Sequence, residues 1–118
     1  MLTPEDSNSL AEKPCPSCRG EVPALSESEC LALKPQLHPE WRLEGRLFLE
    51  REFSFRSYRA GLEFTQQVGE LAEAENHHPD VALGFRNVKV RWWTHKINGL
   101  SEADFIMAAK TDTLPDLP

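Results

Sequence analysis

The run EAENHHPD, residues 73–80, lies where the longest helical pattern of the chain meets a pattern of strands. Upstream of this run, Ser57 is a suitable helix N-cap. Apolar side chains follow it at three- and four-residue spacing, which is typical of a helix with one buried face. Because Pro79 disfavours helical backbone at His78, the helix is predicted to end within residues 76–77.

Strand patterns lie on both sides of this helix. Apolar and polar side chains alternate between residues 41 and 53, and Gly45 offers a turn within that segment. A second alternation runs through residues 81–85 and 88–94, with Asn87 in or near its turn. Each segment therefore predicts a β-hairpin with one buried face.

Two further helices are predicted from capping boxes. Ser26 with Glu29 begins one that Pro35 ends or weakens, and Ser101 with Asp104 begins the last one. The predicted order is α-β-β-α-β-β-α. Because hairpins join the strands, we expect an α+β fold with a four-stranded antiparallel sheet and three helices on one face.

The ends of the chain lack such periodicity. Residues 1–24 are rich in Pro, Ser and acids and are predicted to form a mobile or loosely draped arm, residues 25–112 the folded domain, and residues 113–118 a frayed tail. Cys15 and Cys18 in the arm are interpreted as plain thiols, because neither a second CxxC nor a nearby His completes a metal site. A metal site shared between two subunits is an open alternative.

Composition excludes several classes of protein. The net charge of −6 argues against non-specific binding to nucleic acid or to an anionic membrane, since both require a basic face. No segment is long and apolar enough to span a bilayer, and the N-terminus has no signal-peptide features. The odd number of cysteines, three, predicts free thiols in a reducing cytosol, so a cytoplasmic location is expected.

Three of the four histidines gather at predicted element ends: His77, His78 and His95. An imidazole with a pKa of about 6.5 can exchange protons near neutral pH without a metal. On a helix, Glu73 would lie within reach of the His77 ring. The same pair also fits a structural role at a helix end. A metal site is less consistent, because adjacent histidines point apart, unlike the i, i+4 pair of a zinc helix.

Seven spaced positions resemble the signature of the pterin-4a-carbinolamine dehydratase family: Glu73, His77, His78, Pro79, Phe85, His95 and Asp104. The resemblance extends over residues 24–111 and includes Trp41. It implies the same α+β fold, an antiparallel four-stranded sheet with three helices on one side. It also implies a hydro-lyase that dehydrates 4a-hydroxytetrahydropterin to quinonoid dihydropterin and water in tetrahydrobiopterin recycling. The resemblance implies no metal and no organic cofactor.

The resemblance also implies roles for the site residues. His77 and His95 are expected to be the general acid and base, and Glu73 to orient His77. His78 is expected to bind and position the pterin.

Three more residues, Pro79, Trp93 and Asp104, complete the expected substrate-binding set. For Trp93, packing in the core or in a subunit interface is the favoured alternative to a place beside the pterin. Asp104 is expected either to support the site from behind or to stabilise its helix N-terminus.

Relatives on this scaffold leave two other functions open. The scaffold also serves a transcriptional coactivator that retains the active site and carboxysome-associated assembly factors without activity, so fold alone does not fix function. A different pterin activity, for example one connected with molybdopterin, is a second alternative. Members form homodimers or homotetramers through the sheet edge and the long helix and are functionally linked to aromatic amino acid hydroxylases. The sequence leaves the physiological pterin and the subunit number open.

Overall fold

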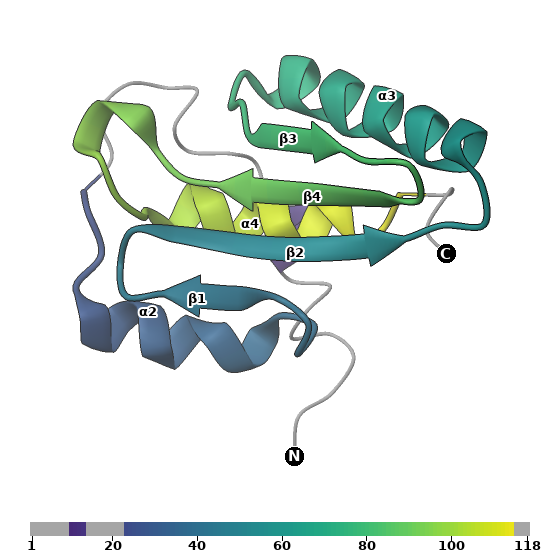
Figure 1. Cartoon of the computed structure of the whole chain (residues 1–118). Helices are drawn as coiled ribbons and strands as arrows, with labels where there is room; N and C mark the ends of the chain where they lie inside the picture. Colours follow the sequence, from purple (N-terminus) through teal and green to yellow (C-terminus); the bar gives the residue numbers. More distant parts are fainter. Residues whose placement is uncertain (1–9, 14–22, 115–118) are drawn as a thin grey trace.

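The structure is a computed structural model that describes residues 10–13 and 23–114. Its helices and strands follow the predicted order, with two short 3-10 helices added (Figure 1). The elements are α2 (Glu27–Leu33), η2 (Lys34–Gln36), β1 (Arg42–Glu44), β2 (Phe48–Ser54), α3 (Tyr58–Glu75), β3 (Asp80–Leu83), β4 (Asn87–Trp92), η3 (His95–Ile97) and α4 (Glu102–Thr111).

The four strands form one antiparallel sheet in the order β1-β2-β4-β3. In its centre β2 pairs with β4, so that Phe53 lies opposite Val88. The apolar residues of both strands, such as Val90 and Trp92, are buried on one face, whereas Lys89 on the other face is exposed. This alternation with a period of two explains why one face of the sheet attracts the helices.

The helices share the covered face. α4 packs against β2 and β4, and α3 packs against β3 and β4. In Figure 1, α3 runs along the β3 edge, α2 runs along the β1 edge, and α4 lies between them. Phe53, Phe55 and Phe64 bring their rings together in the core, with neighbouring centroids 4.8 and 5.2 Å apart. The predicted α+β fold is confirmed.

The helix starts also agree with the sequence. The side chain of Ser57 accepts the backbone N–H of Ala60, and Ser26 forms the predicted capping box with Glu29. Asp104 accepts the backbone N–H of Ser101 at the start of α4. These caps depend on residues three apart in the chain, which is why the sequence reveals them.

Both ends of strand β4 differ from the prediction. Strand β4 begins at Asn87, which was predicted in or near the turn, and it ends at Trp92 instead of running on to Thr94. Thr94 forms an isolated bridge with Gly99, and His95 begins η3. The loop closes through Asn98, whose backbone is left-handed with φ of 49°.

Residues 10–13 of the predicted arm lie against the folded domain. Leu10 is buried with the core, the Lys110 ammonium donates to the Ala11 carbonyl at 2.6 Å, and Lys13 pairs with Glu102. The predictions for Cys15, Cys18 and residues 115–118 lie outside the described residues. In the part of the chain that the structure describes, none of the helices has the length and apolarity needed to cross a membrane.

Candidate active site

The end of α3 turns His77 into the protein. Asn76 adopts a left-handed backbone, φ 54°, directly after the helix ends at Glu75. The His77 N–H then donates to the Ala72 carbonyl at 3.1 Å, which is the pattern of a Schellman helix end. The His77 side chain is only 7% exposed, and its ring stacks on Trp92 with centroids 5.7 Å apart and planes at 7°. His77 is therefore fixed in place between the helix end and the sheet.

A buried carboxylate holds the His77 ring. Nε2 of His77 lies 2.7 Å from Oδ1 of Asp104, which is completely buried. The other oxygen, Oδ2, accepts the Thr94 hydroxyl at 2.6 Å and the Ser101 N–H at 2.9 Å. An ionised carboxylate has only acceptors, so Nε2 of His77 carries the hydrogen of this bond. In the neutral ring the basic lone pair is then on Nδ1.

Glu73 pairs with His78, which corrects the expectation that it orients His77. Its Oε2 lies 2.6 Å from Nε2 of His78, and the two side chains are 75% and 50% exposed. The expectation assumed that His77 continues the helix. Because Asn76 ends the helix first, the spacing of four no longer places His77 above Glu73.

His95 lies at the surface beside Trp93. Their ring centroids are 4.0 Å apart, with planes tilted by 40°. The Trp93 indole N–H donates to Oδ2 of Asp80 at 2.7 Å, and Asp80 follows Pro79 as the first residue of β3. Trp93 thus connects the His95 loop to the segment that carries His78.

A shallow pocket of about 220 Å³ lies beside Trp93, on the sheet face that the helices leave open. Its lining residues are Leu47, Phe48, Asp80, Arg91, Trp93 and Asn98. The Arg91 guanidinium lies 3.8 Å above the Phe48 ring and donates to Glu50. Trp93 is half-buried and lines this pocket, whereas the core position belongs to its neighbour Trp92. Trp93 is thus not a core residue of the single chain, and its packing in a subunit interface stays a prediction.

Sequence reasoning assigned no role in the site to three residues that contact it. Trp92 supports the His77 ring, and Thr94 and Ser101 surround the Asp104 carboxylate. The contacts of Trp92 and Thr94 join segments that come together only in the folded chain, so local spacing gives no signal for them. The contact of Ser101 with Asp104 is the capping box that the sequence predicts.

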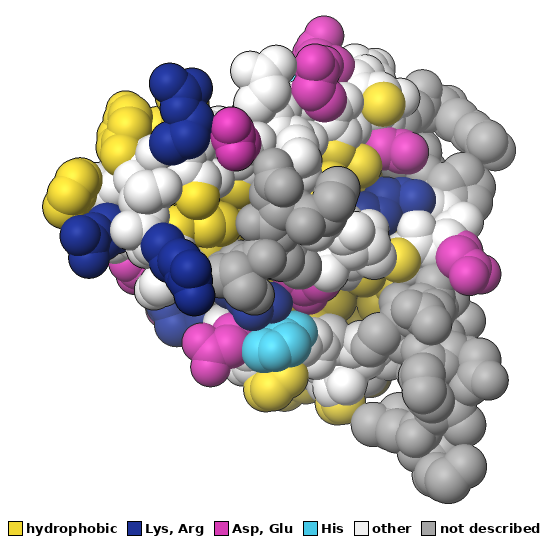
Figure 2. All heavy atoms as spheres, turned by 90° about the vertical axis from the view of Figure 1, so that its right-hand side faces the viewer, with side chains coloured by type: hydrophobic (Ala, Val, Ile, Leu, Met, Phe, Trp, Pro, Cys, Tyr) yellow, Lys and Arg dark blue, Asp and Glu magenta, His cyan; other side chains and the backbone are white. Residues whose placement is uncertain are grey.

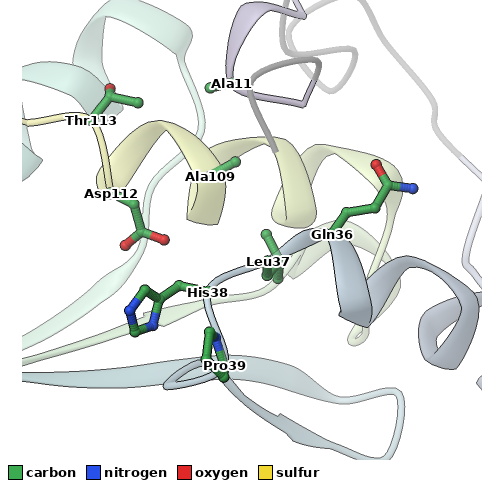
Figure 3. Close-up of a pocket in the computed structure, with 8 residues that line it drawn as sticks. All are labelled: Ala11, Gln36, Leu37, His38, Pro39, Ala109, Asp112 and Thr113. Carbon is green, nitrogen blue, oxygen red and sulfur yellow. The ribbon is translucent and has the colours of Figure 1, made fainter. Parts of the chain in front are cut away.

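The fourth histidine lies elsewhere. His38 lines a pocket of about 350 Å³ at the C-terminal end of α4, where it faces Asp112 (Figure 3). Asp112 accepts hydrogen bonds from Trp41 and Arg51, both at 2.8 Å. Burial raises the pKa of the Asp112 carboxyl despite these donors. His38 is thus separated from Asp104 by most of the length of a ten-residue helix.

The end of the molecule that faces the viewer in Figure 2 lies opposite the ends of α3 and β4. Lysine and arginine side chains lie there beside hydrophobic ones, near the β3–β4 turn and the start of α3. Phe85 and Tyr58 are exposed, and the Arg86 guanidinium lies 5.1 Å from the Phe85 ring centroid.

Among the described residues, no group of three or more His, Cys, Asp or Glu side chains is arranged to hold a metal ion.

The fold and the buried histidine–carboxylate pair define an α+β protein with a site at the ends of α3 and β4. A family model described as pterin 4 alpha carbinolamine dehydratase matches residues 23–114. Two curated relatives named "Putative pterin-4-alpha-carbinolamine dehydratase", from Alkaliphilus metalliredigens and Rubrobacter xylanophilus, are each 48% identical over 105 residues. These matches cover 89% of this chain and 95% and 97% of the relatives. The chain therefore belongs to the pterin 4 alpha carbinolamine dehydratase family.

Solved structures agree with this assignment. A transcriptional coactivator/pterin dehydratase from Brucella melitensis is 32% identical, with a TM-score of 0.69 over 76% of this chain and 96% of that chain. A pterin dehydratase-like protein identified as a RuBisCO assembly factor in the alpha-carboxysome is 27% identical, with a TM-score of 0.54 over 64% of this chain and 88% of that chain. The scaffold is thus associated with more than one role.

Proposed function

We propose that this protein dehydrates 4a-hydroxytetrahydropterin to quinonoid dihydropterin and water, as a hydro-lyase of tetrahydrobiopterin recycling in the cytoplasm. The observation that supports this most strongly is the buried pair of His77 and Asp104 in a chain of the dehydratase family. A buried imidazole fixed by a carboxylate is a suitable general acid or base at neutral pH.

The reaction needs two proton transfers and no oxidant. The C4a–O bond breaks while the departing hydroxyl takes up a proton and leaves as water. The N5 proton is lost, and the C4a–N5 double bond forms. Two imidazoles can perform these proton transfers, and we assign the transfers to His77 and His95.

The other site residues would bind and position the pterin. His78 is exposed and is held by Glu73, so we assign Glu73 to the orientation of His78. The Trp93 ring offers an apolar surface beside His95 and borders the pocket on the open sheet face. Pro79 fixes the direction of the chain between His78 and β3.

The test is the dehydration of 4a-hydroxytetrahydropterin generated in situ by an aromatic amino acid hydroxylase, followed by ultraviolet absorbance. We expect His77→Ala and His95→Ala each to lower turnover strongly while the far-ultraviolet circular dichroism is unchanged. His38→Ala is the matched control, because His38 lines the other pocket, and it should keep wild-type turnover. Wild-type rates in both site variants would refute the assignment.

A second candidate role, protein binding or assembly, is supported by the likeness to the structure identified as a RuBisCO assembly factor. A folded protein that gives no acceleration in the dehydration assay would favour this role. The presence of His77, His78 and His95 at the family positions supports the enzyme instead.

We also propose a homodimer or homotetramer. Strand β3 is an edge strand whose Val81 is exposed, and Tyr58 and Leu62 are exposed on α3. Unpaired sheet edges and exposed apolar side chains favour association between copies. Light scattering on the purified chain should give the mass of two or four subunits, and a monomer would contradict the proposal.

A further inference from the structure

Thr94 directly precedes His95 in the chain, and it contacts Asp104, the residue that holds His77. Its backbone closes the His95 loop: the Thr94 N–H donates to the Gly99 carbonyl at 2.8 Å, and the Ile97 N–H donates to the Thr94 carbonyl at 3.2 Å. Its side chain points the other way and contacts the Asp104 carboxylate that holds His77. One residue thus touches the supports of both histidines.

The directions of the hydrogen bonds around Thr94 can be assigned. Its hydroxyl has a single hydrogen, which the bond to Oδ2 of Asp104 uses at 2.6 Å. The bond between Thr94 Oγ1 and Ser101 Oγ, 2.8 Å, is therefore donated by Ser101. The Ser101 hydroxyl thus donates to Thr94, and the Thr94 hydroxyl donates to Oδ2 of Asp104. The other carboxylate oxygen, Oδ1, accepts the N–H of His77.

We propose that Thr94 is a positioning residue that couples the two histidines, by fixing the Asp104 carboxylate that orients His77 while it anchors the loop of His95. The proposal rests on the proposed dehydratase function for its kinetic consequence. Thr94 is 4% exposed, so water has little access to replace its hydroxyl. Loss of the hydroxyl would leave Oδ2 with only the Ser101 N–H and free the carboxylate to rotate.

The test compares Thr94→Val, which removes the hydroxyl at nearly equal volume, with Thr94→Ser, which keeps it. We expect Thr94→Val to lower kcat about 10- to 100-fold, the range for groups that orient a functional imidazole, with KM changed less than about threefold. Thr94→Ser should restore kcat to within about threefold of wild type. Thr94→Ala is measured as well, because it removes the hydroxyl without placing a methyl group against Asp104.

Thr65→Val is the matched control for the loss of a threonine hydroxyl. Its Oγ1 donates to the Gly61 carbonyl at 2.8 Å within α3, outside the site. Wild-type kcat is expected for this variant. Wild-type kcat in Thr94→Val or Thr94→Ala, or an equal loss in Thr94→Ser and Thr94→Val, would overturn the proposal.

A second readout does not depend on activity. Nitrogen-15 nuclear magnetic resonance of the His77 ring should show a protected Nε2–H in the wild type that Thr94→Val loses and Thr94→Ser keeps. If the wild type shows no dehydratase activity but this pattern holds, the proposed function fails and the positioning role stands. An unchanged Nε2–H signal in Thr94→Val would overturn the positioning role whatever the activity.

Discussion

Nε2 of His77 lies 2.7 Å from Oδ1 of Asp104, across a separation of 27 residues in the chain. The histidine follows the end of α3, and the carboxylate belongs to the first turn of α4. Asp104 thus has two roles at once, because it caps α4 through the Ser101 N–H and orients the His77 ring. These contacts are compatible with both alternatives that the sequence leaves open for this residue.

Asp104→Asn tests the role of Asp104 in orienting His77. The asparagine can still cap the helix, but its amide can present NH₂ instead of an acceptor to His77. We predict a loss of kcat of about 10- to 100-fold with a small change in the midpoint of thermal unfolding. The control Asp112→Asn, at the other end of α4, should keep wild-type kcat. Equal activity in both variants would argue against a role of Asp104 in orienting His77.

Glu73→Gln should have a much smaller effect. Glu73 pairs with His78 at the surface, and exposed ion pairs contribute about 0 to 1 kcal/mol. We predict a change in kcat below about threefold and a modest rise in KM, measured under the same assay conditions. Glu70→Gln, one turn earlier on α3, is the control. A loss as large as that of Asp104→Asn would show that Glu73 acts on the chemistry after all.

The contacts of the Glu50 carboxyl predict that the stability of the fold depends on pH. Burial on the sheet raises the pKa of its carboxyl, but hydrogen bonds and charges from Arg42 and Arg91 outweigh burial and lower the pKa overall. A lowered pKa in the folded state means that Glu50 stabilises the fold above the unfolded pKa of about 4.3 and that this stabilisation is lost as the pH falls through the folded value.

The corresponding measurement is urea unfolding of Glu50→Gln at pH 7 and pH 3. We expect a loss of about 1 to 3 kcal/mol in the free energy of unfolding at pH 7, and a smaller difference from wild type at pH 3. Glu52→Gln, exposed on the same strand, is the control. A difference that grows toward acidic pH would contradict the predicted sign.

A substitution at Leu10 tests whether residues 10–13 belong to the fold. It is 1% exposed and lies in the main core cluster. We predict that Leu10→Ala lowers the free energy of unfolding by about 2 to 5 kcal/mol, because it removes buried methyl groups and leaves a cavity. Leu31→Ala, at an exposed site on α2, should change it by less than about 0.5 kcal/mol. Equal effects would place Leu10 outside the core.

Local chemistry made most of the fold predictable. The N-caps at Ser26, Ser57 and Ser101 depend on partners three residues away, and the alternation in β2 and β4 follows from one covered face. The end of β4 was harder to predict from the sequence, because the bridge between Thr94 and Gly99 forms across a loop that Asn98 closes.

The sequence drew attention to candidate site residues but not to their pairings. The spacing suggested Glu73 for His77, and the left-handed backbone of Asn76 redirects that contact to His78. The true partner of His77, Asp104, comes from another element, and helical periodicity has no information about such contacts.

The most direct measurement is the rate of 4a-hydroxytetrahydropterin dehydration, with the pterin generated by a hydroxylase, for wild type, His77→Ala and His38→Ala side by side. We predict acceleration by the wild type and by His38→Ala, and its loss in His77→Ala with the fold intact. No acceleration by the folded wild type, or equal acceleration by all three proteins, would contradict the assignment of dehydratase chemistry to this site.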